Sequence, residues 1–178
     1  VPVEQLSFDE AAELAYFGAK ILHPACIWPA QHYNVPVKLL NAMQPNAAGT
    51  TITAISTTKG VKAVAAKDGI IAIKIKSSRM LLAYGFLRKI FEVFEKYKTS
   101  IDMITTSEIA VSLTIDNTKY LKEITKELEE FAKVEIEQDQ TIICIVGNLP
   151  KNKAGYGFKV LESLKDIPLR MVSYGGSS

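Results

Sequence analysis

The chain has 178 residues, of which 48% are hydrophobic and 22% charged, a balance typical of a globular protein with one medium or two small domains. The formal net charge is only +2, without a block of like charges, so neither nucleic acid nor an anionic membrane is expected as a partner. No apolar run approaches the roughly 20 residues that span a bilayer, and the first ten residues do not resemble a signal peptide. The two cysteines are far apart and share no motif with either histidine, which predicts buried thiols in a reducing, cytoplasmic setting and no metal site.

The first fifty residues carry signals for helices and a strand. Ser7 and Glu10 have the spacing of a capping box, in which each side chain bonds the other residue's free backbone N–H. Apolar residues continue at helical spacing to Ile21, and Pro24 is expected to end this helix. The other elements expected here are a helical turn over 27–33, a strand over 35–40 and a loop over 46–50.

Residues 61–137 alternate between strand and helix patterns. Strands are predicted over 61–66 and 70–76, with a turn at 67–69 between them and a loop over 77–84. Amphipathic helices are predicted over 85–97 and 120–132, and further strands over 101–104, 109–115 and 134–136. From residue 70 the order is therefore strand, helix, strand, strand, helix, strand, the ferredoxin-like α+β arrangement with both helices on one face of a sheet. The pattern begins again as a strand over 141–146, a helix over 155–164 and a strand over 169–173, an imperfect repeat that lacks its last strand and helix.

Three segments resemble aspartate kinase, in the order in which that family carries them. They are EAAELAYFGAKILHP at 10–24, SIDMITTSE at 100–108 and IPLRMVSYGGSS at 167–178. The first is similar to the end of the catalytic domain, and the other two to strands of the paired regulatory ACT domains. The TTSE motif at 105–108 is most similar to the lysine-sensitive branch of the family.

The resemblance implies an organisation that the elements alone do not give. The first ACT domain, 70–140, would be inserted in a second, incomplete one made of 54–69 and 141–178. A short α/β tail of the kinase domain, 1–53, would precede both, and the ACT sheets would form a homodimer.

The resemblance also implies an activity for the full-length protein. That family uses ATP with Mg²⁺ to phosphorylate L-aspartate to 4-phospho-L-aspartate, the first step of lysine, threonine and methionine biosynthesis. Such chemistry needs a phosphate cradle, and no P-loop or glycine-rich loop occurs in this sequence, so the stretch alone is predicted to be inactive and to hold no cofactor. Lys20 and Ile21 match family positions that touch the nucleotide. The alternative is a solvated lysine near a helix end, and this alternative is favoured for Lys20 in the stretch alone because the rest of a nucleotide pocket is missing.

The residues themselves indicate a site for a free amino acid. The helix expected to begin at Gly85 offers unpaired N–H groups and a positive dipole end to a carboxylate. Asp102, between two apolar residues, suits an ammonium group, and Ser107 with Glu108 could hold a second one. Two acidic groups fit lysine better than threonine. The alternative is that Gly85 only starts a helix and Asp102 only ends a strand; the residues leave this open, and the resemblance favours the ligand site.

The resemblance adds effector contacts at Met80, Ala83, Phe86, Leu87, Ser100 and Ile101. The loop around Ala83 is apolar, so its contacts would come from backbone groups or be absent, which leaves lysine and threonine both possible. The expected mechanism is feedback inhibition, with the amino acid bound between two first ACT domains and its effect carried through 50–59. Two other functions stay open: an inert dimerisation scaffold, and a small-molecule transferase, which the lack of a nucleophile–base pair disfavours.

Overall fold

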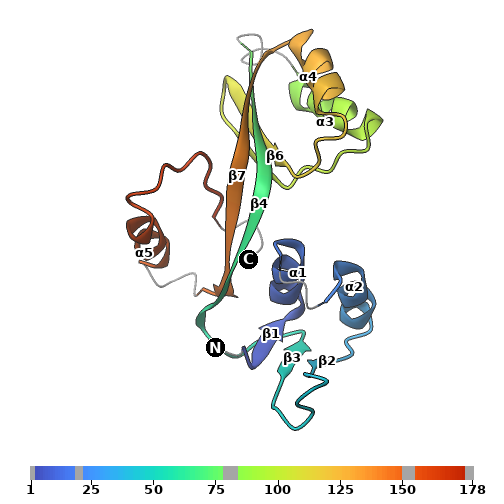
Figure 1. Ribbon diagram of the computed structural model, residues 1–178, viewed down its shortest axis with the longest axis vertical. Coiled ribbons are helices and arrows are strands. Elements are labelled where there is room, and N and C mark those ends of the chain that lie inside the picture. Colours follow the sequence, from blue (N-terminus) through green and yellow to red (C-terminus); the bar gives the residue numbers. More distant parts are fainter. Residues whose placement is uncertain (1–2, 19–21, 78–83, 150–154, 175–178) are drawn as a thin grey trace. The chain divides into compact units, whose positions relative to one another are not determined.

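The fold was analysed in a computed structural model that describes residues 3–18, 22–77, 84–149 and 155–174 (Figure 1). The chain divides into two compact units, each of which is discontinuous in sequence. Unit 1 comprises Val1–Lys67 and Ile142–Asp166, and unit 2 comprises Asp68–Thr141 and Ile167–Gly176. The two units are therefore described separately.

Unit 1 is built around a small sheet with two helices. Its first five elements are β1 (Gln5–Ser7), α1 (Phe8–Tyr16), α2 (Pro24–His32), β2 (Val37–Leu39) and β3 (Thr50–Thr53). The strand order is β1-β3-β2, with β1 parallel and β2 antiparallel to β3. Leu6, Phe8, Leu14, Ile27 and Ile52 form most of its buried core. β1 and β3 were not predicted, because three or four residues are too few to establish a period of two.

The capping box of α1 is confirmed, and the predicted end of that helix is wrong. Glu10 N–H donates to Ser7 Oγ at 3.1 Å, and Ser7 N–H donates to the Glu10 carboxylate at 2.7 Å. The helix ends at Tyr16, and Gly18 follows in a left-handed conformation with φ of 116° that favours glycine. Pro24 opens α2 instead of ending α1, since the first helical position needs no N–H donor.

Unit 2 has the predicted ferredoxin-like topology. Its sheet is formed by β4 (Gly60–Lys76), β5 (Met103–Thr106), β6 (Ala110–Ile115) and β7 (Lys133–Asn148), and its helices are α3 (Phe86–Lys96) and α4 (Leu121–Glu129). The order β5-β6-β4-β7 places the second, third, first and fourth strands of the unit side by side, which confirms the α+β prediction. Figure 1 shows α3 and α4 together beside this sheet.

The core of unit 2 follows directly from the alternation in its strands. Ile73 on β4 pairs with Leu113 on β6, and both are at most 1% exposed. Their neighbours two residues away on each strand are buried as well, so one face of the sheet is apolar. Ile90 on α3 and Ile124 on α4 cover that face with no exposed surface, and burying each such side chain contributes about 1.5–3 kcal/mol.

The predicted turn at 67–69 and the predicted break between the strands at 134–136 and 141–146 both lie inside long strands. The strands expected over 61–66 and 70–76 are one strand, β4, and those expected over 134–136 and 141–146 are one strand, β7. Gly69, with φ of 73°, and Asp139, with φ of 56°, adopt left-handed conformations at these positions. The Thr141 hydroxyl donates to Asp68 at 2.6 Å between the neighbouring strands. The left-handed residues are therefore accommodated as irregularities within the pairing, as in a bulge.

The C-terminal part of the chain differs from the prediction. Helix α5 (Tyr156–Ser163) is present, but the strand expected over 169–173 is irregular in the structure. A strand requires a neighbour for its backbone groups, and no strand pairs with this segment among the described residues. The segment is instead joined to β7 by an ion pair between Arg170 and Glu137 at 2.7 Å.

Two expectations from composition can be compared with the described residues. Cys26 is exposed and Cys144 is half-buried, so the prediction of two buried thiols is wrong for Cys26. Burial raises the pKa of the Cys144 thiol to about 11. Within the described ranges, no helix has the length and apolar character needed to cross a membrane.

Candidate functional site

The predicted effector residues fall into groups at the two ends of α3. Gly85, Phe86 and Leu87 begin the helix, whereas Ser100, Ile101 and Asp102 follow its C-terminal end. Thr99 N–H donates to Phe94 O at 3.0 Å, which holds this second segment against the last turn of α3. An 11-residue helix is about 16 Å long, so its length separates the two groups.

Gly85 provides the space that a carboxylate site at the helix start would need. It caps α3 with φ of 83°, and apart from its two chain neighbours no described residue has an atom within 4 Å of the position that a Cβ would take. The first intrahelical bond runs from Lys89 N–H to Gly85 O, so the amides before it have no partner within the helix. Leu87 is 38% exposed beside them. Phe86 is different: it is 8% exposed and packs edge-on against Phe131 at 5.9 Å, so its side chain serves the core.

Asp102 lies at a bend immediately before β5 and not on a strand as predicted. Its N–H donates to Thr114 O at 2.9 Å, and one of its carboxylate oxygens, Oδ2, is shielded from solvent. Ile101 packs against the unit 2 core and Ser100 is exposed. The segment therefore presents a partly buried carboxylate beside apolar surface, a setting that suits an ammonium group.

Ser107 and Glu108 form the turn between β5 and β6, as predicted. Ser107 donates its N–H at 2.8 Å and its hydroxyl at 3.3 Å to Ala110 O, while Glu108 is exposed. This turn lies beside the end of β4, where Ser77 N–H donates to Ile109 O at 3.1 Å. Asp102 is six residues before Glu108, and β5 (Met103–Thr106) lies between them, so an extended chain separates the two by up to about 20 Å. The two acidic groups of one chain are thus too far apart to bind the two ends of one lysine.

The remaining predicted residues cannot be placed. Met80 and Ala83 of the effector set, and Lys20 and Ile21 of the nucleotide set, lie outside the described residues. In the described part of the chain, no group of three or more His, Cys, Asp or Glu side chains is arranged to hold a metal ion.

An ion pair near the Asp102 end joins the two helices of unit 2. Glu127 on α4 accepts hydrogen bonds from the Lys96 ammonium and from the Tyr97 hydroxyl, the latter at 2.7 Å. The bond from Lys96 lowers the pKa of Glu127, and the same carboxylate raises the pKa of Lys96 and of Tyr97. The contact fixes the C-terminal end of α3, from which the Asp102 segment continues.

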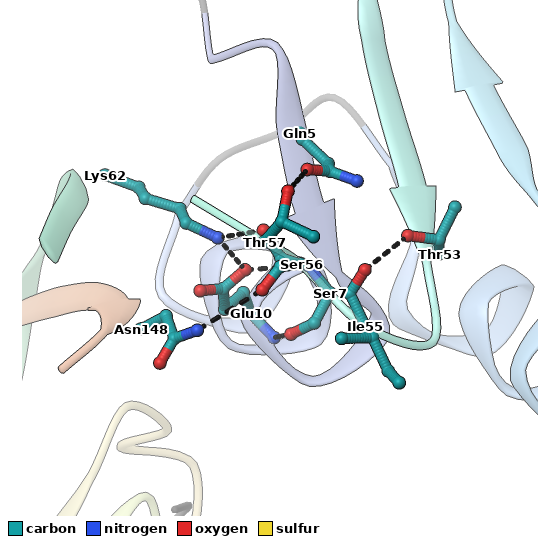
Figure 2. A network of polar contacts seen from close by, with 9 residues as sticks. All are labelled: Gln5, Ser7, Glu10, Thr53, Ile55, Ser56, Thr57, Lys62 and Asn148. Atoms are coloured by element: carbon teal, nitrogen blue, oxygen red, sulfur yellow. Dashed lines mark hydrogen bonds and ion pairs between the residues drawn. The ribbon is translucent and has the colours of Figure 1, made fainter. Parts of the chain in front are cut away.

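A polar cluster in unit 1 was not predicted. Figure 2 shows the Lys62 side chain directed at Glu10 and Ser56. The Lys62 ammonium donates to Glu10 Oε2 at 2.7 Å and also to the Ser56 hydroxyl, and the Lys62 and Glu10 side chains are only 3% and 11% exposed. The capping box pattern identified Glu10 from the sequence, but no local pattern indicates that it pairs with Lys62, 52 residues away.

Residues 73–125, which include α3, the Asp102 segment and the first part of α4, match the ACT domain family. Unit 2 is therefore an ACT-type regulatory module.

Relatives that match the whole chain identify its family more specifically than the ACT domain does. The chloroplastic aspartokinase 3 of Arabidopsis thaliana is 40% identical over 99% of this chain and 34% of its own length. Aspartokinase III of Escherichia coli has TM-scores of 0.87 in complex with aspartate and ADP (R-state) and 0.80 in complex with lysine and aspartate (T-state). The sequences of those two structures are 33% and 34% identical to this chain, and each match covers at least 98% of this chain and 41% of the E. coli chain.

A solved domain from Porphyromonas gingivalis, assigned as a C-terminal regulatory domain of aspartate kinase, is 50% identical over 65% of this chain and 78% of that one, with a TM-score of 0.58. The chain thus belongs to the aspartokinase family and corresponds to its regulatory region, as the sequence resemblance predicted. It spans about a third of the length of the Arabidopsis relative.

Proposed function

We propose that this chain is the regulatory region of an ATP- and Mg²⁺-dependent aspartate kinase and that it binds lysine as a feedback inhibitor. The E. coli relative solved with lysine and aspartate in a T-state supports lysine as the ligand. In this chain the proposed contacts for the two charged ends of an amino acid are the start of α3 and Asp102. Lys20 and Ile21 remain proposed nucleotide contacts, and the cytoplasmic location remains a prediction, since one relative is chloroplastic.

The observation that carries the proposal is the separation of the two groups by the length of α3. One chain cannot bring Gly85 and Asp102 to one small ligand, but a two-fold dimer can place the α3 start of one copy beside Asp102 of the other. Each site would then be shared by two unit 2 modules. A ligand that binds only this arrangement stabilises it, and that difference in affinity is what inhibition requires.

Calorimetric titration tests the ligand. Lysine should release or absorb heat, whereas threonine and methionine should not; a response to threonine alone would refute lysine. Norleucine has the carbon chain of lysine without the side-chain ammonium. Comparing the two ligands therefore distinguishes the role of Glu108 from that of Asp102. If Glu108 binds that ammonium, Glu108→Gln should weaken lysine and leave norleucine unchanged.

Mixing two variants tests the shared site. Asp102→Ala removes the ammonium partner, and Leu87→Glu places a negative charge at the start of α3, where it favours the helix dipole and repels a ligand carboxylate. Neither variant should bind lysine alone. In an equal mixture half of the dimers are mixed, and each of these has one intact site, so about a quarter of the sites should recover. No recovery in exchanging dimers would mean that the site is not shared.

An inert dimerisation scaffold is the second candidate. Its support is that two predicted contact side chains have structural roles, Phe86 in the core and the Ser107 hydroxyl in its own turn. A scaffold should form concentration-dependent dimers whose melting temperature does not respond to any of the three amino acids.

A further inference from the structure

The buried cluster in unit 1 joins segments that are distant in sequence (Figure 2). Glu10 belongs to the first turn of α1, and its Oε2 accepts both the Ser7 N–H and the Lys62 ammonium at 2.7 Å. Ser56 lies in the irregular connection between β3 and β4, and Asn148 at the end of β7 donates from its side-chain amide to Ser56 O at 3.2 Å. Four segments therefore meet at one polar contact.

Stability alone is a weak explanation for this cluster. Removing two charges from water costs about as much as their attraction returns, and replacing a buried ion pair by apolar residues is often neutral or stabilising. Such a pair is costly mainly when one partner is missing. A buried ion pair therefore stabilises the one conformation in which the two charges meet, relative to all conformations in which they are apart. An element that couples two sites needs such an energy difference between its two conformations.

The position of Lys62 connects this discrimination to unit 2. Lys62 is the third residue of β4, and the same strand continues through Ile71–Lys76, where it pairs with β6. Asn148 is the last residue of β7, which begins in unit 2 at Lys133. The unit 1 part of each long strand thus contains a residue of the cluster, and the other part of each strand belongs to the sheet of the ACT-type module.

We propose that the Glu10–Lys62–Ser56 cluster is the coupling lock through which a ligand on unit 2 changes helix α1. A change in the unit 2 sheet reaches the cluster along β4 and β7, and the cluster passes it to α1 by holding or releasing the Glu10 carboxylate. This inference rests on the proposed function, because it requires an amino acid to bind unit 2.

Hydrogen exchange measured on the whole 178-residue chain, with and without saturating lysine, tests the lock. In the wild type, lysine should slow the exchange of α3 amides in unit 2 and change that of α1 amides about fivefold or more, the lower end of typical coupling. The double variant Glu10→Gln/Lys62→Met leaves no unpaired buried charge and keeps an acceptor for the Ser7 N–H. There α3 should respond as before, and α1 by less than about twofold.

Two further variants complete the experiment. Lys133→Met removes a lysine that is 76% exposed and ion-paired with Glu135 at 3.4 Å, so it controls for the loss of a lysine and should leave the α1 response intact. If the double variant does not fold, Ser56→Ala removes only the hydroxyl partner of Lys62 and should reduce the α1 response partway.

Each outcome decides between the hypotheses. An unchanged α1 response in the double variant, or in Ser56→Ala where it replaces that variant, overturns the lock. So does a wild type in which lysine protects α3 without affecting α1, and in that case the proposed ligand site stands. If lysine does not protect α3 in the wild type, the proposed lysine site itself fails and the coupling fails with it.

Discussion

A close backbone approach between β4 and β7 in unit 1 gives a sharp stability prediction. A Cβ on Gly147 would lie 2.2 Å from Gly60 O and 2.9 Å from Val61 Cα, although real Cβ contacts essentially never fall below 3.0 Å. Because both contacting atoms are backbone atoms, no side-chain rotation can relieve the overlap. Gly147→Ala must therefore push β4 and β7 apart by about 1 Å, with a packing penalty of about 1–3 kcal/mol and the loss of one or two hydrogen bonds worth about 1 kcal/mol each. We expect a total loss of about 3 kcal/mol.

Urea unfolding followed by circular dichroism measures this loss. With a slope of about 2 kcal/mol per molar urea, the midpoint should fall by about 1.5 M. Gly60→Ala is the matched control across the same contact. Among the described residues its Cβ would meet the Tyr156 hydroxyl alone, at 3.9 Å, so the expected cost is the strain of φ at 101°. That strain costs about 1–2 kcal/mol. Equal losses in the two variants, or a smaller one for Gly147→Ala, would refute the close approach of the strands.

Three further predictions concern unit 2. Asp102→Asn keeps the size of the side chain and removes its charge, so lysine affinity should fall by roughly 10- to 100-fold in calorimetry, the value of a charge-assisted hydrogen bond; an unchanged affinity would remove Asp102 from the site. Thr114 is 5% exposed, and its hydroxyl has no hydrogen-bond partner among the described residues, so Thr114→Val should raise the free energy of unfolding by about 1 kcal/mol; a loss of stability would indicate an unrecognised partner. In the folded state the pKa of Glu127 is held below its ordinary value of 4.5, chiefly by Lys96. The ionised carboxylate therefore stabilises the fold above that value, and this stabilisation is lost as the pH falls through the folded pKa. The stability difference between wild type and Glu127→Gln should accordingly be constant from about pH 7 to pH 5 and shrink below about pH 4, and a difference independent of pH would contradict this.

The sequence by itself determined the elements whose stability depends on their own periodicity. Helices α3 and α4 and strand β6 have apolar residues at regular spacing over 6 to 11 residues, and the structure buries those residues on one face. The capping box of α1 is equally local, because Ser7 and Glu10 are only three residues apart. Local interactions of this kind are visible in any single chain, and their order was sufficient to predict the ferredoxin-like unit.

The tertiary structure decided the features that depend on distant partners. Whether Gly69 and Asp139 end a strand depends on the neighbouring strand, and here β4 and β7 continue through both. Whether 169–173 forms a strand depends on a backbone partner, which the described residues do not supply. The candidate site follows the same rule: Gly85, Asp102 and Glu108 were found from their local chemistry, but only the length of α3 and the register of β5 separated them within one chain. The ion pair between Glu10 and Lys62 spans 52 residues, and no local pattern encodes it, because the two charges meet only when the chain has folded.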